Sequence, residues 1–362
     1  MVIITDCSYR SSIAAIYSLV RLNEEIIGVT TNKTPSPPAF HSKYLKKTYV
    51  LSSDKDKYKE ELLKLCSSFD RPIILPIGVF TLDIISNNLD EFRSVCDFCI
   101  SDSETLQIIN DKSKSKEIAA SAGINVPEIY HGENVEFPAV VKPICGEKFG
   151  LKASERYKIV HNEKELYGAK SLFSFSDVVI EKYVDGKGVG VSVIMNNNKP
   201  YTAFCHKRLS EYPASGGPSS SLVTFYDNEL IEKTIRLLQK AKFSGIAMVE
   251  YKEKEGEYYF LEVNPRIWGS FGATHKAKSD FIEAYINASR NNEYHFSPKY
   301  KIGKKVKFVP NVFASVISYV KEKKYQKAFK TSIDAINPFV QNAIFSIRDP
   351  LPSLLDIFRK RR

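Results

Sequence analysis

The side chains best suited to chemistry stand at the end of one predicted strand, residues 258–264. Side chains alternate between the two faces of an extended strand, so Glu262 and Asn264 share a face. Pro265 ends the strand and Arg266 follows it directly. Carboxylate and amide oxygens suit a hard cation such as Mg2+, and a guanidinium suits a phosphate or a carboxylate. The pattern predicts a cation site with an anion site beside it.

A predicted antiparallel hairpin adds a second carboxylate, Glu250, because residues 246–252 and 258–264 face each other across a short polar turn. We predict the register in which Glu250 pairs with Phe260. The residues that then share one face are Met248, Glu250, Phe260, Glu262 and Asn264. A slip of one residue would separate the two carboxylates. Glu250, Glu262 and Asn264 are the candidate ligands of Mg2+, with Mn2+ as an alternative ion, although two glutamates alone are also ordinary strand residues.

Two lysines upstream have the character of phosphate ligands. Lys112 stands at the start of a predicted helix that Asn110 or Asp111 caps. Lys142 lies inside an apolar strand, residues 137–143, where burying a charge is costly unless an anion meets it. A nucleoside triphosphate would supply that anion.

A further apolar strand within residues 177–186 leaves into a turn and offers its backbone edge to a flat base such as adenine. The residues at this exit are Glu181, Lys182, Tyr183 and Val184. The sequence therefore places two lysines for phosphate and one backbone edge for a base before the predicted Mg2+ site.

Arg208 closes a predicted strand, residues 200–208, beside a loop rich in small residues. Gly216 and Gly217 in that loop leave the backbone open to a ligand. We predict that Arg208 contacts an anionic substrate or a γ-phosphate. The alternative for Arg208 and its neighbour Lys207 is a solvated strand edge.

The first hundred residues alternate between strand and helix patterns, which predicts a parallel, Rossmann-like sheet. The expected elements are strands at 2–5, 26–30 and 72–76 and helices at 11–22 and 55–66. The loop at residues 6–12 has no Gly-x-Gly-x-x-Gly, which argues against a dinucleotide site there. Its polar residues either meet a substrate at the carboxyl end of the sheet or cap the following helix.

Composition narrows the class of protein. With 362 residues, 43% of them hydrophobic, the chain can form two or three globular units. No run reaches the roughly 18 apolar residues of a membrane-spanning helix, and the first residues do not resemble a signal peptide, so a cytoplasmic location is expected. The six dispersed cysteines are expected to be reduced thiols, with Cys96 and Cys99 buried and not a metal pair.

The positive charge is concentrated in the C-terminal tail. Residues 301–362 hold 14 Lys and Arg against 4 Asp and Glu, which accounts for the whole formal net charge of +10. The neutral body argues against a nucleic-acid partner. The tail pairs apolar runs with lysines and arginines, which predicts basic amphipathic helices that dock on their own protein. An alternative is that residues 351–362 lie on an anionic membrane surface, in which case the acceptor substrate would be lipid-linked.

The ordered set of these stretches resembles the ATP-grasp superfamily. The stretch from Glu262 to Arg266 and the upstream positions match in order over roughly residues 1–300, and within the superfamily residues 205–219 resemble the carboxylate-amine ligases of the carbamoyl-phosphate-synthase large-chain type. The resemblance implies an α/β plus α+β chain with a Rossmann-like pre-ATP-grasp domain at 1–105. It further implies an ATP-grasp small lobe at 106–185, a C-terminal lobe with the Mg2+ site at 186–300, and a basic helical tail at 301–362.

The same resemblance implies an ATP-dependent ligase. Lys112, Lys142 and the loop with Gly146 would contact phosphates, residues 181–184 would receive adenine, and Arg266 would stabilise an acyl phosphate that an amine then converts to an amide. Residues 143–150 carry fewer glycines than many relatives, and residues 186–190 read Gly-Lys-Gly-Val-Gly where many relatives place an acid for the ribose. The ribose contact is therefore unassigned.

Other functional classes remain open. One alternative is a carboxyphosphate-using enzyme of the carboxylase or carbamoyl-phosphate-synthase type, although the chain has no biotin-carrier or glutaminase-like segment. Another is a regulatory ATP-binding protein without turnover, although such a protein has no need for the complete metal set. The expected partners are a small-molecule carboxylate and an amine, and a homodimer is the default expectation for the oligomeric state.

Overall fold

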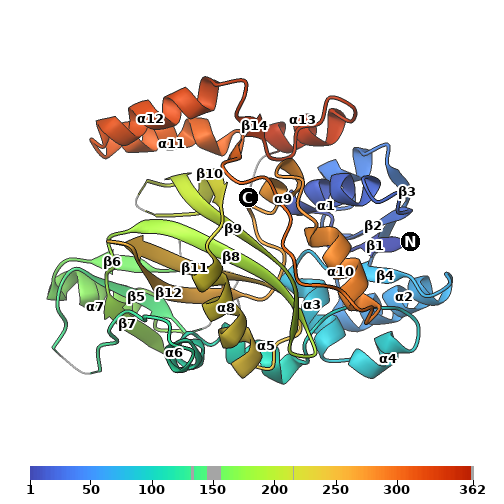
Figure 1. Ribbon diagram of the computed structural model, residues 1–362, viewed down its shortest axis with the longest axis horizontal. Helices are drawn as coiled ribbons and strands as arrows, with labels where there is room; N and C mark the ends of the chain where they lie inside the picture. Colours follow the sequence, from blue (N-terminus) through green and yellow to red (C-terminus); the bar gives the residue numbers. More distant parts are fainter. Residues whose placement is uncertain (132–133, 145–155, 215, 360–362) are drawn as a thin grey trace.

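The computed structural model describes residues 1–131, 134–144, 156–214 and 216–359, arranged around three sheets (Figure 1). The first sheet is parallel, in the order β3-β2-β1-β4, as the alternating pattern predicts. Its strands are β1 (Val2–Ile4), β2 (Ile26–Thr31), β3 (Leu45–Leu51) and β4 (Ile73–Leu75). Strand β3 was not predicted, because its middle residues are exposed and polar and it pairs at the edge of the sheet.

The two predicted helices of this part form at 11–20 and 55–67, and the three others were not predicted. The longest are α1 (Ser11–Val20) and α2 (Lys55–Ser67), and three shorter helices lead out of the domain: α3 (Val79–Ser86), α4 (Leu89–Arg93) and α5 (Ser103–Asn110). Strand β2 is followed by the 3-10 helix η1 (Pro38–His41). The helix at residue 112 forms as α6 (Lys112–Ser121), and the Asp111 carboxylate caps it by accepting hydrogen bonds from two backbone N–H groups.

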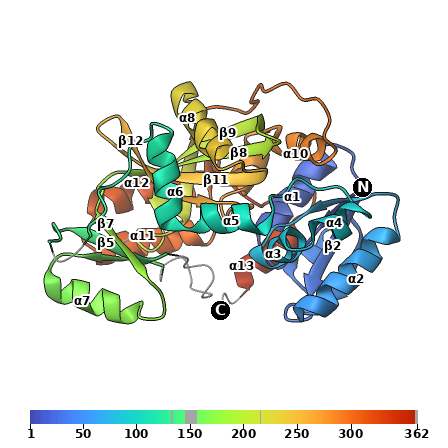
Figure 2. The ribbon, with the colours of Figure 1, turned by 90° about the horizontal axis from the view of Figure 1, so that it is seen from below.

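The second sheet is small and antiparallel, in the order β6-β5-β7. It contains β5 (Ala139–Pro143), β6 (Lys158–Val160) and β7 (Val178–Lys182), and α7 (Glu163–Leu172) covers it. This unit has a small core of its own, made by Val141, Leu166, Phe173 and their neighbours. It lies at the opposite end of the molecule from the parallel sheet (Figure 2).

The third sheet lies between the other two and has the order β12-β11-β8-β9-β10-β13-β14. Its strands are β8 (Lys187–Asn196), β9 (Lys199–Glu211), β10 (Ser219–Phe225), β11 (Gly245–Lys254), β12 (Glu257–Asn264), β13 (Lys305–Lys307) and β14 (Gln341–Asn342). Helix α8 (Asn228–Lys240) buries its apolar stripe in the core formed with this sheet. Helices α9 (Gly272–Lys276) and α10 (Phe281–Ser289) pack toward the parallel-sheet domain.

Strands β11 and β12 form the predicted antiparallel hairpin, but the predicted register is wrong by two residues. Glu250 pairs with Glu262 and not with Phe260, and the extra residue Leu261 bulges out before Tyr251 pairs with Phe260. Since the error is an even number of residues, the two carboxylates still share one face. Phe260 does not: the bulge turns it to the opposite face, where it is fully buried beside Tyr251.

Residues 311–358 form a helical layer along one side of the molecule, at the top of Figure 1. Its helices are α11 (Asn311–Lys321), α12 (Tyr325–Ile336) and α13 (Leu351–Phe358). Strands β13 and β14 connect this layer to the large sheet. Within the described ranges, no helix has both the length and the apolar character needed to cross a bilayer.

Candidate active site

A cleft of about 1650 Å³ opens between the small sheet, the large sheet and the loop after β1. Eleven of the twelve residues singled out from the sequence line it: Lys112, Lys142, Glu181, Lys182, Tyr183, Val184, Arg208, Glu250, Glu262, Asn264 and Arg266. The twelfth, Gly146, lies outside the described residues. Stretches that are up to 154 positions apart in the sequence therefore meet at one cavity.

The hairpin forms one wall of the cleft, and each of its two carboxylates is paired with a cation from elsewhere. Arg208 Nη2 donates to Glu250 Oε2 at 2.6 Å. Lys112 Nζ lies 3.6 Å from Glu262 Oε2. The two carboxylates predicted to bind a cation thus pair with two of the side chains predicted to bind an anion, Arg208 and Lys112.

Asn264 and Arg266 complete the same network. Asn264 Nδ2 donates to Glu250 Oε1 at 3.3 Å, and Asn264 Oδ1 accepts from Arg266 Nη2 at 3.2 Å. The backbone turns sharply after the strand, with the Arg266 N–H donating to the Asn264 carbonyl at 2.9 Å. This turn brings the guanidinium back beside the amide that precedes it in the strand.

The electrostatics of Glu250 favour a cation in the cleft. Burial raises its pKa, and the neighbouring Glu262 carboxylate adds to the rise while Arg208 opposes it. Two carboxylates and an amide oxygen on one face fit Mg2+, which takes oxygen ligands and keeps positions for water and phosphate. Within the part of the chain that the structure describes, no group of three or more His, Cys, Asp or Glu side chains could hold a metal ion, so a closed all-protein cage is not among these residues.

A buried charge cluster lies next to this network and includes a residue that the sequence analysis missed. Glu181 is only 2% exposed and joins Lys116 at 2.5 Å and Lys142 at 2.6 Å. Although burial opposes ionisation, Lys142 and Lys116 lower the pKa of Glu181. Burial, with Lys142 adding to the effect, lowers the pKa of Lys116 to about 8.

Lys116 could have been found from its spacing. It follows Lys112 by four residues, so both lysines lie on one face of α6. Its ammonium also lies 5.9 Å from the Phe260 ring, which the bulge in β12 turns toward it. The anion that meets the buried Lys142 in this structure is therefore the protein's own Glu181.

The exit of β7 lines the cleft through Tyr183, Val184 and the following turn. The side chain of Lys182 is half exposed and pairs with Glu136 at 2.8 Å, and its backbone N–H donates to the Glu128 carbonyl at 2.9 Å. The lysine side chain is therefore held by carboxylates of the small unit, and the backbone N–H of the next residue, Tyr183, donates to the Pro138 carbonyl at 3.1 Å.

Arg208 is not on a solvated strand edge, because its side chain is only 16% exposed. Besides Glu250, it donates to the Gly217 carbonyl at 3.1 Å and to Glu211 at 3.3 Å. It passes over Gly188, where an added Cβ would lie 2.6 Å from Arg208 Cδ. Gly188, which lacks a Cβ, thus provides the space for Arg208.

Lys207, Cys96 and Cys99 do not line this cleft. Lys207 lies in β9 between β8 and β10, and its side chain pairs with Glu253 at 2.8 Å and lies over the Phe225 ring. Cys96 and Cys99 are buried thiols, each donating to a backbone carbonyl. Burial raises the pKa of Cys99 to about 12, which keeps this thiol protonated.

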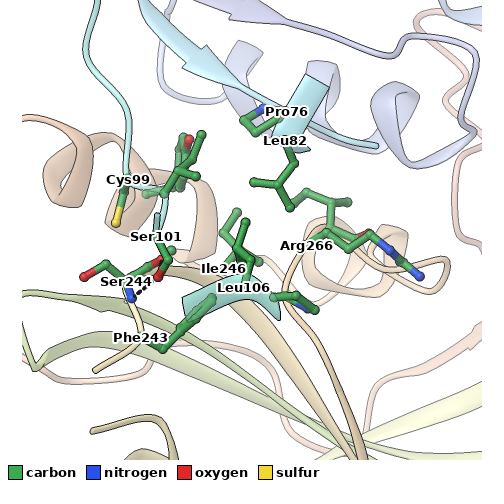
Figure 3. Close-up of a pocket in the computed structure, with 14 residues that line it drawn as sticks. Pro76, Leu82, Cys99, Ser101, Leu106, Phe243, Ser244, Ile246 and Arg266 are labelled. Carbon is green, nitrogen blue, oxygen red and sulfur yellow. Dashed lines mark hydrogen bonds between the residues drawn. The ribbon is translucent and has the colours of Figure 1, made fainter. Parts of the chain in front are cut away.

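A second cavity, of only about 20 Å³, lies behind the cleft near Pro76, Leu106 and Ile246. Arg266 borders it, but Figure 3 shows its guanidinium turned away from the cavity. Across it the Ser244 N–H donates to Ser101 Oγ at 2.7 Å, which connects the chain leaving the parallel-sheet domain to the large sheet. This cavity is a packing defect at a domain junction and is too small for a substrate.

Comparisons with known proteins agree with this geometry. The family described as "ATP-grasp in the biosynthetic pathway with Ter operon" matches residues 174–310. A D-alanine–D-alanine ligase of Fusobacterium nucleatum is 28% identical over 169 residues, which are 43% of this chain and 56% of that protein. The carbamoyl phosphate synthase large chain of a Thermoanaerobacter species is 23% identical over 181 residues, 45% of this chain and 17% of that one.

The fold also matches a solved structure. The N5-carboxyaminoimidazole synthetase of Staphylococcus aureus, complexed with ADP, superposes with a TM-score of 0.65 at 17% identity, covering 89% of this chain and 85% of that one. The chain spans little more than half of the D-alanine–D-alanine ligase and under a fifth of the synthase. The cleft, the order of its residues along the chain and these matches together show that the chain is similar to proteins of the ATP-grasp superfamily.

Proposed function

We propose that this protein is an ATP- and Mg2+-dependent, ADP-forming ligase that joins a small-molecule carboxylate to an amine. The observation that carries the proposal is the pairing of three oxygen ligands with three cations in one cleft: Glu250 with Arg208, Glu262 with Lys112, and Asn264 with Arg266. A nucleotide triphosphate with its Mg2+ brings the same two kinds of charge. It can therefore exchange partners with both halves of the network without leaving a charge uncompensated.

The cations and the oxygen ligands of this network then have separate roles. Lys112 and Lys142 hold phosphate oxygens, and the exit of β7, with Glu181 beside it, receives adenine. Gly146 belongs to the loop that we propose to cover the phosphates. Glu250, Glu262 and Asn264 hold Mg2+, or Mn2+ in its place, and the ion when bound neutralises charge on the transferred phosphoryl group.

Arg266 and Arg208 are the residues that we assign to the reacting groups. The substrate carboxylate attacks the γ-phosphorus of ATP, the bond to the bridging oxygen breaks, and ADP leaves with that electron pair. The products of this step are an acyl phosphate and ADP. Arg266 orients the carboxylate and stabilises the charge on the acyl phosphate, while Arg208, on the other side of Glu250 in the same network, contacts the same anionic group.

The second step forms the amide. The amine nitrogen attacks the acyl carbon, the bond from that carbon to the phosphate oxygen breaks, and inorganic phosphate leaves while the nitrogen loses a proton. No nucleophilic side chain is required, because positioning and charge neutralisation supply most of the acceleration in phosphoryl transfer. This explains why the cleft is built from cations and oxygen ligands.

Each domain predicted from the sequence has a role in this proposal. We propose that residues 1–105 select the substrate, since Tyr9, Arg10 and Ser11 after β1 line the cleft. Residues 106–185 and 186–300 clasp ATP, and residues 301–362 form the tail layer. The natural setting that we propose is the cytoplasm, with a homodimer as the assembly and a lipid-linked acceptor as a special case of the amine substrate.

A carboxyphosphate-forming reaction is the second candidate, and the similarity to the carbamoyl phosphate synthase large chain favours it. In that case bicarbonate takes the place of the organic carboxylate. Both reactions use the same cation site, so the substrate that triggers ADP release separates them.

The test is ADP and phosphate release by the purified protein with Mg2+. The panel contains amino acids and uronic acids as carboxylates, a set of amines, and bicarbonate in a separate arm. We expect release only when an organic carboxylate and an amine are both present. Release with bicarbonate alone would favour the second candidate, and ATP binding without release on any substrate would favour a regulatory protein.

A further inference from the structure

The helices of the tail are oriented opposite to the usual surface helix. A surface helix normally turns its large apolar residues toward the core and its polar residues toward solvent. In α11 the buried positions are Val312, Ser315 and Tyr319, and the exposed large apolar positions are Phe313, Ile317 and Val320. In α12 the buried side chains are small or polar, and the exposed stripe is Phe329, Ile333 and Ile336.

The same inversion continues after α11 and α12. In α13 the buried side chains are Pro352, Ser353 and Asp356, while Leu351, Leu354 and Phe358 are exposed. Between the helices, Phe339 and Ile347 are 87% and 88% exposed. These segments lie along one side of the molecule, away from α7 (Figures 1 and 2). We call this surface, made by the exposed apolar residues of α11, α12, α13 and their connection, the tail face.

The charged residues of the tail also differ between its buried side and its exposed side. Three of its four acids are buried and are bound by partners in the protein: Asp334 by Lys305 at 3.0 Å, Asp349 by the Ser42 hydroxyl, and Asp356 by Arg10 at 3.4 Å. The fourth, Glu322, pairs with Lys324. By contrast, Lys321, Lys323, Lys327, Lys330 and Arg348 are exposed. The outward side of the tail therefore combines large apolar side chains with a strong excess of positive charge.

We propose that the tail face docks on an anionic lipid bilayer. Apolar side chains that enter the headgroup region, together with lysines and arginines that remain among the headgroups, are what an interfacial helix layer needs. A second copy of the chain fits this face less well, because docking two copies would bring two basic surfaces together. Lys323, in the turn before α12, and Lys327, in the first turn of α12, also line the cleft, so a docked protein holds its cleft beside the headgroups.

The proposal does not depend on the ligase reaction, and sedimentation of the full-length chain with vesicles tests it. One set of vesicles is phosphatidylcholine alone and the other contains phosphatidylglycerol as well. We expect binding to the second set, weakened by high salt. The double variant Ile317→Gln/Ile336→Gln should reduce the partition coefficient about tenfold or more, because both side chains lose their apolar transfer energy. The double variant Lys321→Gln/Lys330→Gln should reduce it about fivefold for each lysine.

Matched controls come from α7, on the other side of the molecule. Tyr167→Gln/Leu172→Gln removes two exposed apolar side chains and Lys164→Gln/Lys170→Gln removes two exposed lysines, and neither should change binding. All four variants alter exposed residues, so thermal unfolding should match the wild type and confirm that each is folded. ADP release without vesicles should be unchanged in all of them, which separates this proposal from the ligase proposal.

Three outcomes would overturn the docking proposal. The first is equal partition onto the two kinds of vesicle. The second is binding that survives the Ile317/Ile336 variant. The third is protein that does not bind vesicles but associates with itself in a concentration-dependent way that this variant abolishes, which would assign the tail face to a second copy of the chain.

Discussion

Arg208 on β9 reaches across β8 to Glu250 on β11, and its Nη2 lies 2.6 Å from the carboxylate oxygen. The side chain can take this path because Gly188, which it passes over, has no Cβ. The same guanidinium is anchored by the Gly217 carbonyl at the edge of the small-residue loop. A contact between two strands that are not neighbours thus depends on a glycine in the strand between them.

Gly188→Ala should therefore displace Arg208 without unfolding the protein. The new methyl group would lie 2.6 Å from Arg208 Cδ, so the arginine must leave its position above β8. We expect kcat of ADP release to fall about tenfold to a hundredfold, because an anchored cation at the reacting group is lost. The free energy of unfolding should change by less than about 1 kcal/mol, since the displaced side chain can reach solvent.

The matched control is Gly168→Ala on α7, whose added Cβ meets no atom within 4 Å. It should leave kcat unchanged. The account of Arg208 fails if Gly188→Ala retains full turnover while still binding ATP. Urea unfolding of both variants shows whether a loss of activity is a loss of fold.

The stability of the protein should depend on the ionisation of Lys116. Burial lowers the pKa of Lys116 to about 8 in the folded protein, against an ordinary value of 10.5. Between these values the unfolded chain binds a proton that the folded protein does not, so the free energy of unfolding rises as pH rises from about 8 to 10.5. The resulting gain in the free energy of unfolding is roughly 3 kcal/mol. It is complete above pH 10.5 and absent below about pH 8.

Lys116→Met removes this contribution and leaves Glu181 paired with Lys142 alone. Urea unfolding at intervals from pH 7 to about 10.5 should show a difference between wild type and variant that shifts toward the wild type as pH rises. Lys114→Met, an exposed position on the same helix, is the control. A difference between the wild type and Lys116→Met that stays constant over this range would show that Lys116 keeps its proton when buried.

Arg266 should act on the reacting carboxylate more than on ATP binding. Arg266→Met is expected to lower kcat about a hundredfold to a thousandfold, as loss of one transition-state donor does elsewhere, while KM for ATP changes little. Arg266→Lys keeps the charge but loses the planar fork, so it should restore only part of the rate. Steady-state kinetics with each substrate varied in turn make the distinction, and an increase in KM for ATP alone would instead assign Arg266 to nucleotide binding.

The sequence predicts the elements around the site better than the contacts within it. The β11–β12 hairpin and the parallel sheet follow from strong hydrophobic patterns. The register of the hairpin does not follow from such a pattern, because no residue pattern predicts the bulge at Leu261 that shifts Phe260 to the other face. The edge strand β3 was not predicted for a related reason: its exposed middle residues do not alternate between apolar and polar.

The pairing of the charges could not be predicted either. Lys142 was expected to need an anion, but the sequence cannot show that Glu181, from a neighbouring strand, provides it together with Lys116. Similarly, the tail reads as basic and amphipathic, while only the structure shows that its apolar stripes point outward. Local patterns determine elements, and the meeting of distant side chains depends on how those elements pack.

The rate of ADP release as a function of free Mg2+ tests the central claim most directly, in the wild type, Glu262→Gln and the control Glu255→Gln, an exposed residue in the turn of the same hairpin. If the hairpin carboxylates hold the ion, Glu262→Gln should need more Mg2+ and reach a maximal rate about a hundredfold lower, while Glu255→Gln behaves as the wild type. An unchanged Mg2+ dependence and rate in Glu262→Gln would contradict the assignment of the β11–β12 hairpin as the cation site.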